Sequence, residues 1–181
     1  MVRQEEQQLT PRAAVVLDCE PVSQGTAKDR QGQWEFSSVF EWCVVATASI
    51  TAHLVKAGYV VVLQSNGTGI DRFIADGQDT LEDAMVDLAV IEPEEHDNDR
   101  HVAPERAVFI VLGRVSVERA QHWAQVMATS RAVLALVTSN TSPEARGILE
   151  DARWRVVTYG PKDDIRELWS EFDGKRAHAA G

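Results

Sequence analysis

The sequence predicts a three-layer, doubly wound α/β fold with a mostly parallel sheet and one short antiparallel edge strand. Apolar runs of strand length alternate with segments that have helical caps and helical spacing of apolar residues. The first run, residues 13–17, is wholly apolar and ends at Asp18, which is typical of a strand buried on both faces. Because right-handed crossovers join parallel strands, we expect helices on both faces of this sheet.

Length and composition indicate one soluble domain. The chain has 181 residues, of which 44% are hydrophobic and 25% are charged, and such a chain can bury a sizeable core. Its 28 acidic and 18 basic residues give a formal net charge of -10, which repels nucleic-acid phosphates and anionic membrane surfaces. Cys19 and Cys43 form no CxxC motif, so we expect reduced thiols in a cytoplasmic setting.

Three parts are expected along the chain: a connector over residues 1–12, a domain over 13–173 and a disordered tail over 174–181. The first residues are polar and charged and lack the apolar core of a signal peptide. The most apolar helical stretch contains His53 and Lys56, so we do not expect it to cross a membrane.

The first half of the chain predicts two helices beside the central strands. A polar loop over residues 19–36 leads to a capping box of Ser38 and Glu41, which begins a widely apolar helix that runs to about Lys56. A helix with so much apolar surface is expected to lie deep against the sheet. A second helix, capped by Asp79 or Thr80, follows later.

A hairpin is predicted between these two helices. Residues 59–63 are rich in β-branched side chains and form the next strand. The pair Asn66-Gly67 follows it and is the strongest short signal for a hairpin. We therefore expect residues 68–74 to return as a short antiparallel edge strand.

The last third of the chain alternates strands and helices. Three further strands are expected over residues 107–112, 132–137 and 154–158. Ser116 and Ser142 each precede a helix as N-cap residues, and Pro143 takes the first helical position of the second. A last helix is expected from Asp163.

Two passages carry a family resemblance: Val2–Glu6 leading into Pro11–Asp18, and Phe40–Ile50 running on to Val55–Tyr59. Together they resemble the carboxyl-terminal part of the bacterial domain-of-unknown-function family fifty-eight in its actinobacterial form. Members of that family carry a von Willebrand factor A-like domain, which has a Rossmann-like α/β fold. The resemblance implies transmembrane helices and a β-rich segment ahead of this domain, so we expect a cytoplasmic fragment of a membrane-anchored protein.

The resemblance also implies a class of function. Members of the family are commonly encoded beside MoxR-type AAA+ ATPases and transglutaminase-like proteins. That neighbourhood suggests a role in assembling or maturing other proteins, with a MoxR-type ATPase as the partner. No catalytic activity is established for the family as a whole.

A metal site at Asp18 is a further implication. Von Willebrand A domains commonly bind Mg²⁺ through a D-x-S-x-S motif after the first strand, a Thr from a later loop and an Asp that closes the fourth strand. Oxygen ligands of this kind suit the ion. Here Glu20 and Val22 replace the two serines, and Arg114 stands about where the closing Asp belongs.

A fixed positive charge beside Asp18 would repel a divalent ion and neutralise the carboxylate without one. We therefore expect no metal or other cofactor, and an Asp18–Arg114 ion pair in its place. The alternative is that Arg114 simply points to solvent. Thr68 and Asp71 lie where a further ligand could arise, although both are more typical of ordinary turn residues.

Two other patterns favour structural interpretations. The acidic neighbours of Cys19 discourage a thiolate, so a buried or half-buried thiol is expected rather than a nucleophile. His96 and His101 lie in an acidic, proline-containing loop over residues 92–106 and are expected to be solvated.

Three functions remain open. The first is a non-catalytic protein-interaction domain with a degenerate metal site, which binds through the loops around Asp18, Glu20 and Arg114 or through the acidic loop 92–106. The second is a Mg²⁺-dependent adhesion or chaperone domain completed by Glu20 and Asp71. The third is an enzyme that uses Asp18 and Glu20 as an acid/base pair, for which no substrate is indicated.

Overall fold

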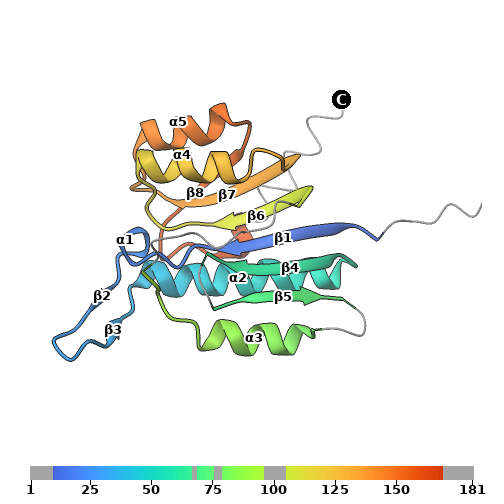
Figure 1. Cartoon of the computed structure of the whole chain (residues 1–181), viewed down its shortest axis with the longest axis horizontal. Helices are drawn as coiled ribbons and strands as arrows, with labels where there is room; N and C mark the ends of the chain where they lie inside the picture. Colours follow the sequence, from blue (N-terminus) through green and yellow to red (C-terminus); the bar gives the residue numbers. More distant parts are fainter. Residues whose placement is uncertain (1–9, 67–68, 76–78, 96–104, 169–181) are drawn as a thin grey trace, which may run out of the picture.

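The structure, a computed structural model, describes residues 10–66, 69–75, 79–95 and 105–168. Within these residues a six-stranded sheet with the order β5-β4-β1-β6-β7-β8 lies between two layers of helices (Figure 1). Strands β1, β4, β6, β7 and β8 are parallel, and the edge strand β5 is antiparallel to β4. The predicted three-layer α/β fold is thereby confirmed, and its architecture is Rossmann-like.

The strands of this sheet are β1 (Arg12–Leu17), β4 (Val60–Ser65), β5 (Asp71–Ile74), β6 (Ala107–Val111), β7 (Ala132–Thr138) and β8 (Arg155–Tyr159). A separate two-stranded sheet pairs β2 (Ala27–Lys28) with β3 (Trp34–Glu35). The helices are α1 (Pro21–Gln24), α2 (Ser38–Lys56), α3 (Leu81–Ala89), α4 (Val117–Val126) and α5 (Pro143–Asp151). Elements α1, β2 and β3 fall within residues 19–36, which the sequence predicts as a loop.

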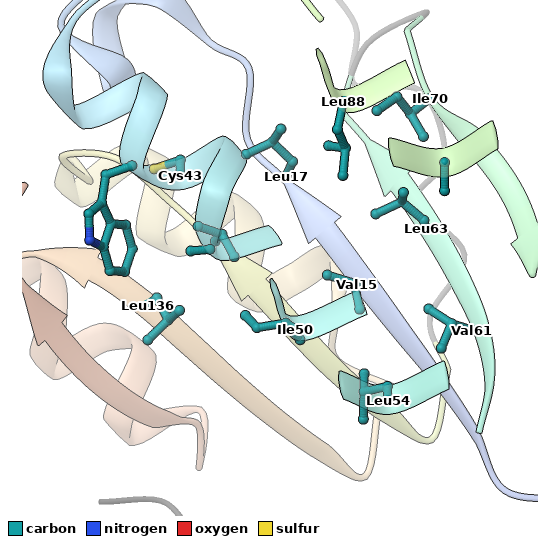
Figure 2. Packing of buried hydrophobic residues seen from close by; sticks show 14 of the residues in the cluster. Val15, Leu17, Cys43, Ile50, Leu54, Val61, Leu63, Ile70, Leu88 and Leu136 are labelled. Atoms are coloured by element: carbon teal, nitrogen blue, oxygen red, sulfur yellow. The ribbon is translucent and has the colours of Figure 1, made fainter. Parts of the chain in front are cut away.

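Strand β1 lies in the middle of the sheet and contributes to both cores. Successive strand residues point to opposite faces, and residues 13–17 are all completely buried. Ala13, Val15 and Leu17 pack in the core on the side of α2 and α3, whereas Ala14 and Val16 pack on the side of α4 and α5. The first core is drawn in Figure 2, where strand residues face the inner side of α2.

Helix α2 is the main element of the first core. Ser37, not Ser38, is its N-cap, because the Ser37 hydroxyl accepts the Phe40 N–H at 3.0 Å. The predicted capping box of Ser38 and Glu41 is therefore wrong: the cap is Ser37, and the residue three positions later is Phe40, which has no carboxylate to complete a box. Cys43, Ile50 and Leu54 point from α2 toward the sheet (Figure 2).

Among the described helices, α2 is long and apolar enough to cross a membrane by length and composition alone. In this structure its inner face is buried in the core beneath β1, β4 and β6. The helix therefore acts here as the core element that the sequence predicts.

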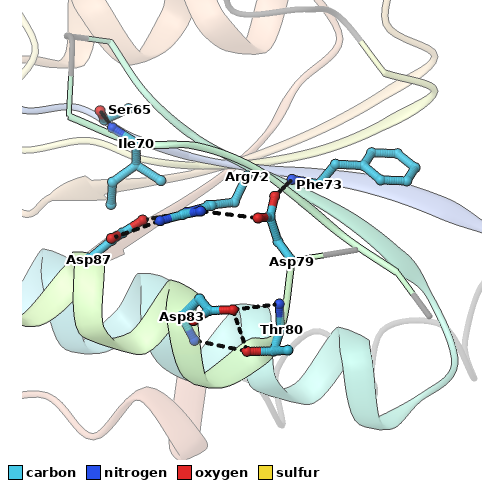
Figure 3. Close-up of polar contacts among 8 residues, drawn as sticks. All are labelled: Ser65, Ile70, Arg72, Phe73, Asp79, Thr80, Asp83 and Asp87. Atoms are coloured by element: carbon cyan, nitrogen blue, oxygen red, sulfur yellow. Dashed lines mark hydrogen bonds and ion pairs between the residues drawn. The ribbon is translucent and has the colours of Figure 1, made fainter. Parts of the chain in front are cut away.

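Polar contacts fasten the edge strand β5 to α3 (Figure 3). The Arg72 guanidinium contacts Asp79 at 3.0 Å and Asp87 at 2.6 Å. Thr80 is the N-cap of α3 and forms a capping box with Asp83. Of the two predicted N-cap residues, Thr80 is therefore correct. Asp79 forms an ion pair with Arg72 instead.

Several predictions concern residues that the structure describes only in part or not at all. Thr68, His96 and His101 lie outside the described residues, as does the predicted tail 174–181. The predicted last helix is described only over its first turn, residues 165–168.

Candidate functional site

The carboxyl ends of three neighbouring strands meet beside β1. Leu17 is paired with Ser65 of β4 on one side and with Val111 of β6 on the other. The chain runs from β1 outward to β4 and β5, and then returns to β6 on the opposite side of β1. Strands β1 and β6 therefore border the topological switch point, where doubly wound sheets bind ligands.

Asp18 lies at this point, and its side chain is completely buried. Its Oδ1 accepts hydrogen bonds from Asn66 Nδ2 at 2.7 Å, from Arg119 Nη2 at 3.0 Å and from the Glu20 N–H at 3.3 Å. Its Oδ2 accepts from the Ser23 hydroxyl at 2.7 Å. A buried carboxylate is costly unless it is paired and hydrogen-bonded, and Asp18 has both kinds of partner.

Arg119 bridges two carboxylates in this cluster. Besides the contact with Asp18, its Nε lies 3.0 Å from Glu20 Oε2. The exposed fraction of the side chain is 16% for Arg119 and 35% for Glu20. The Arg119 guanidinium also lies 5.3 Å from the centre of the Trp123 ring. The cation that neutralises these carboxylates is therefore a side chain of the protein, the Arg119 guanidinium, and not a bound metal ion.

The predicted Asp18–Arg114 ion pair is wrong. Arg114 is exposed, and its backbone N–H donates to the Ser23 carbonyl at 2.7 Å. The alternative, that Arg114 points to solvent, agrees with this exposure. The sequence locates Arg114 at the end of β6 correctly, but the cation that reaches Asp18 comes from the first turn of α4.

A close contact between β6 and α1 explains this geometry. A Cβ atom on Gly113 would lie 2.1 Å from the Ser23 carbonyl oxygen. Only glycine permits the backbone after β6 to approach α1 so closely. The approach brings Ser23 beside Asp18, so the Ser23 hydroxyl can donate to the carboxylate. Ser23 lies five residues after Asp18, outside the D-x-S-x-S positions that Glu20 and Val22 occupy.

The structure brings together some predicted site residues and leaves others apart. Asp18 and Glu20 share Arg119 as a common partner. Asp71 lies on β5, which β4 separates from β1, and its carboxylate accepts from Gln64 Nε2 at 3.2 Å. Asp71 is therefore not positioned to complete a ligand set with Asp18.

Sequence reasoning missed Asn66, Ser23 and Arg119. The sequence predicts only a hairpin turn at Asn66, yet its side chain spans the site, since its Oδ1 also accepts the Cys19 N–H at 2.6 Å. Arg119 carried one signal: it lies in the first turn of a helix, where the helix dipole disfavours a cation. A cation at that position indicates a nearby anion that holds it.

The arrangement does not fit a Mg²⁺ site. Magnesium requires several oxygen ligands in near-octahedral geometry. Both oxygens of Asp18 are already hydrogen-bonded, and the Arg119 guanidinium contacts the oxygen that also binds Asn66. Among the residues that the structure describes, no group of three or more His, Cys, Asp or Glu side chains could hold a metal ion.

An open hollow of about 310 Å³ lies beside the cluster. Its lining includes Glu20, Arg114 and Arg119, with Val22 at 85% exposure. The hollow is lined by charges of both signs, and the carboxylate of Asp18 is screened from it by complete burial. A molecule in this hollow could contact Glu20 or Arg114 but not Asp18.

Both cysteines are buried, free thiols. Burial, with Asp18 as a second cause, raises the pKa of the Cys19 thiol well above its usual value. Burial also raises the pKa of Cys43 to about 12. Cys43 Sγ lies 2.9 Å from the Tyr159 hydroxyl, which donates to the Leu112 carbonyl at 2.8 Å. The prediction that Cys19 is a buried thiol is confirmed.

These features define the class of protein as a Rossmann-like three-layer α/β domain with an arginine-bridged acid at the switch point. A scan against models of known protein families finds no match to this chain, and a search of curated proteins finds no significant match.

Proposed function

We propose that this chain is a non-catalytic protein-interaction domain of the von Willebrand factor A-like type, in which a guanidinium replaces the metal ion. The observation that carries the proposal is the Arg119 bridge between the buried Asp18 and Glu20. A metal in such a domain would tie the loops at the switch point together. Arg119 makes that connection here through two carboxylates.

The burial of Asp18 supports a non-catalytic role. A general acid or base must come within hydrogen-bond reach of the proton that it transfers. Asp18 is completely buried and its oxygens have four donors. Glu20 is partly exposed but paired with Arg119. This geometry favours a structural anchor over an acid/base pair.

The partner is proposed from the family resemblance alone: a MoxR-type AAA+ ATPase, with which the domain would act in assembling or maturing other proteins. Fold does not determine function, so this partner requires a direct test. The purified chain is immobilised and the MoxR-type ATPase encoded in the same genome is passed over it, with an unrelated AAA+ ATPase as the control. Saturable binding of the MoxR-type protein alone supports the proposal, and equal binding of both ATPases contradicts it.

Metal dependence separates this proposal from the Mg²⁺-dependent alternative. A ligand that binds only the native state raises the unfolding temperature. We expect the Tm of the protein to be the same in EDTA and in about 10 mM Mg²⁺ or Mn²⁺, because a saturating site would raise Tm by several degrees. A rise that Asp18→Asn abolishes would contradict the proposal and favour the metal-dependent domain.

A further inference from the structure

An exposed apolar groove lies between α2 and the carboxyl end of α3. We call it the α2–α3 groove; its volume is about 470 Å³, and its apolar lining includes Phe36, Phe40, Val44, Val45, Val90 and Ile91. Five large hydrophobic side chains are exposed among the described residues, and three of them line this groove: Phe36 at 48%, Val45 at 58% and Val90 at 72%. Exposed apolar side chains that cluster in this way mark interaction surfaces.

The groove is formed in the free protein. Phe36 stacks on Phe40 with ring centres 5.7 Å apart, and Phe40 is itself buried at 2% exposure. Phe40 and Val45 project from helix α2, whose inner face is buried in the core, while Val90 is the C-cap residue of α3. Binding therefore needs little ordering of the surface, which favours affinity.

Acidic side chains border the groove. Glu41 and Glu92 belong to its lining. An adjoining cavity of about 660 Å³ shares Val90, Ile91 and Glu92 with it and adds Glu94 and Glu95. The basic residue of that cavity, Lys28, is stacked 4.5 Å from the Trp34 ring centre. An apolar floor with an acidic border is complementary to a partner with the opposite charge.

The acidic border is connected to the arginine-bridged cluster. The Glu94 N–H donates to the Cys19 carbonyl at 3.0 Å, directly after Asp18. At the other end, the Ser37 hydroxyl that caps α2 donates to the Gln24 carbonyl of α1. The segment after β1, which Arg119 contacts through Asp18 and Glu20, is thus hydrogen-bonded both to the start of α2 and to the acidic border.

We propose that the α2–α3 groove binds an amphipathic helix of a partner protein, with basic residues on both sides of the apolar stripe. This inference rests on the proposed function as an interaction domain. Helices commonly bind to such grooves through apolar residues at positions i, i+3, i+4 and i+7. A second copy of this chain or an anionic bilayer fits less well, because a chain with a net charge of -10 repels both.

The test uses a fluorescein-labelled peptide of about 18 residues, or about five helical turns, with leucine at helical spacing and lysine elsewhere. Two control peptides have the same composition in scrambled order, or glutamate in place of lysine. Fluorescence anisotropy of the whole chain with each peptide gives the Kd. We expect the amphipathic basic peptide to bind at least about tenfold more tightly than either control.

Matched variants locate the binding surface. Val45→Ser and Val90→Ser should each weaken binding about fivefold, because each removes one apolar contact from the interface. Glu41→Gln with Glu92→Gln should weaken it further at low salt. Glu144→Gln, which changes an exposed acid on α5 outside the groove, should leave the Kd unchanged.

Several results would overturn the inference. One is an unchanged Kd in the groove variants, and another is equal binding of the scrambled peptide. Sedimentation that shows a dimer converted to a monomer by Val45→Ser with Val90→Ser would place a second copy in the groove. Binding to phosphatidylcholine vesicles that the same variants abolish would place a membrane there. The proposed function fails separately, through a Mg²⁺-dependent rise in Tm that these groove variants do not alter.

Discussion

Arg119 occupies a position that its own helix disfavours. The first turn of α4 is the positive end of the helix dipole, yet Arg119 is the third residue of that helix. Two carboxylates offset this: Asp18, which is completely buried, and Glu20. A buried charge left without its partner is strongly destabilising.

Arg119→Met should therefore lower the free energy of unfolding by about 3 kcal/mol, because Asp18 would lose its counter-charge. Urea unfolding followed by circular dichroism measures the change. The control is Arg114→Met, which alters an exposed arginine at the same end of the sheet and should change stability by less than about 0.5 kcal/mol. Equal effects of the two variants would show that the bridge contributes nothing.

Because the two thiols are buried, the free energy of unfolding should decrease as the pH becomes alkaline. Burial raises the pKa of Cys43 to about 12 in the native state, whereas an unfolded thiol ionises near pH 8.5. Below that pH both states are protonated and the contribution is constant. Above it the unfolded state loses its proton first, so stability falls as pH rises from about 8.5 toward 12.

Chemical denaturation at a series of pH values between about 7 and 10 should show this decline. Cys43→Ala should make the decline shallower, since one of the shifted groups is removed. In the native protein at neutral pH, neither Cys19 nor Cys43 should react with a thiol reagent until the chain unfolds. Rapid labelling of either cysteine under native conditions would contradict the buried environment.

At the scale of elements, the order of strands and helices could be predicted because each long element has its own periodicity and cap. Strand β1 reads as a continuous apolar run, and Pro143 marks the start of α5. Helix α1 was missed because four residues give no periodicity, although Pro21 at its start and Gly25 at positive φ are the usual end signals. Short elements are held by their surroundings more than by their own sequence.

The site was predicted less completely for a related reason. The position of Asp18 at a strand end follows from sequence alone, but its partners depend on how α1 and α4 are rotated over the sheet. Arg119 lies 101 residues from Asp18 along the chain, and neither the spacing nor the strand order specifies that contact. Gly113, which permits the close approach that brings Ser23 beside Asp18, has no distinctive neighbours in the sequence.

The displaced cap of α2 gives a test at the scale of one helix. Ser37 accepts the Phe40 N–H and donates to Gln24, whereas Ser38 is exposed at the first helical position. Ser37→Ala should cost about 1 kcal/mol of stability, as loss of an N-cap usually does. Ser38→Ala should change stability by less than about 0.5 kcal/mol. If Ser38→Ala lowered the Tm more than Ser37→Ala, Ser38 would be the N-cap, as the sequence predicts.

At the scale of the whole molecule, the net charge of -10 acts on stability and on binding in opposite ways. Repulsion among surface acids destabilises the compact state, and salt screens that repulsion. Salt also screens attraction between the acidic border of the α2–α3 groove and a basic helix. The pair of Asp18 and Arg119 is screened less, because Asp18 is completely buried and Arg119 is only 16% exposed.

Raising the NaCl concentration from about 0.02 M to about 0.5 M should therefore raise the Tm of the protein while it weakens binding of the basic amphipathic peptide. Parallel thermal-unfolding and anisotropy titrations measure the two effects. In the variant with Glu41→Gln and Glu92→Gln, the Kd should depend less on salt, because two of the acidic side chains at the groove are neutral. Binding that strengthens with salt would mean that apolar contact alone draws the peptide to this surface, and the charge of the partner would then have to be reassigned.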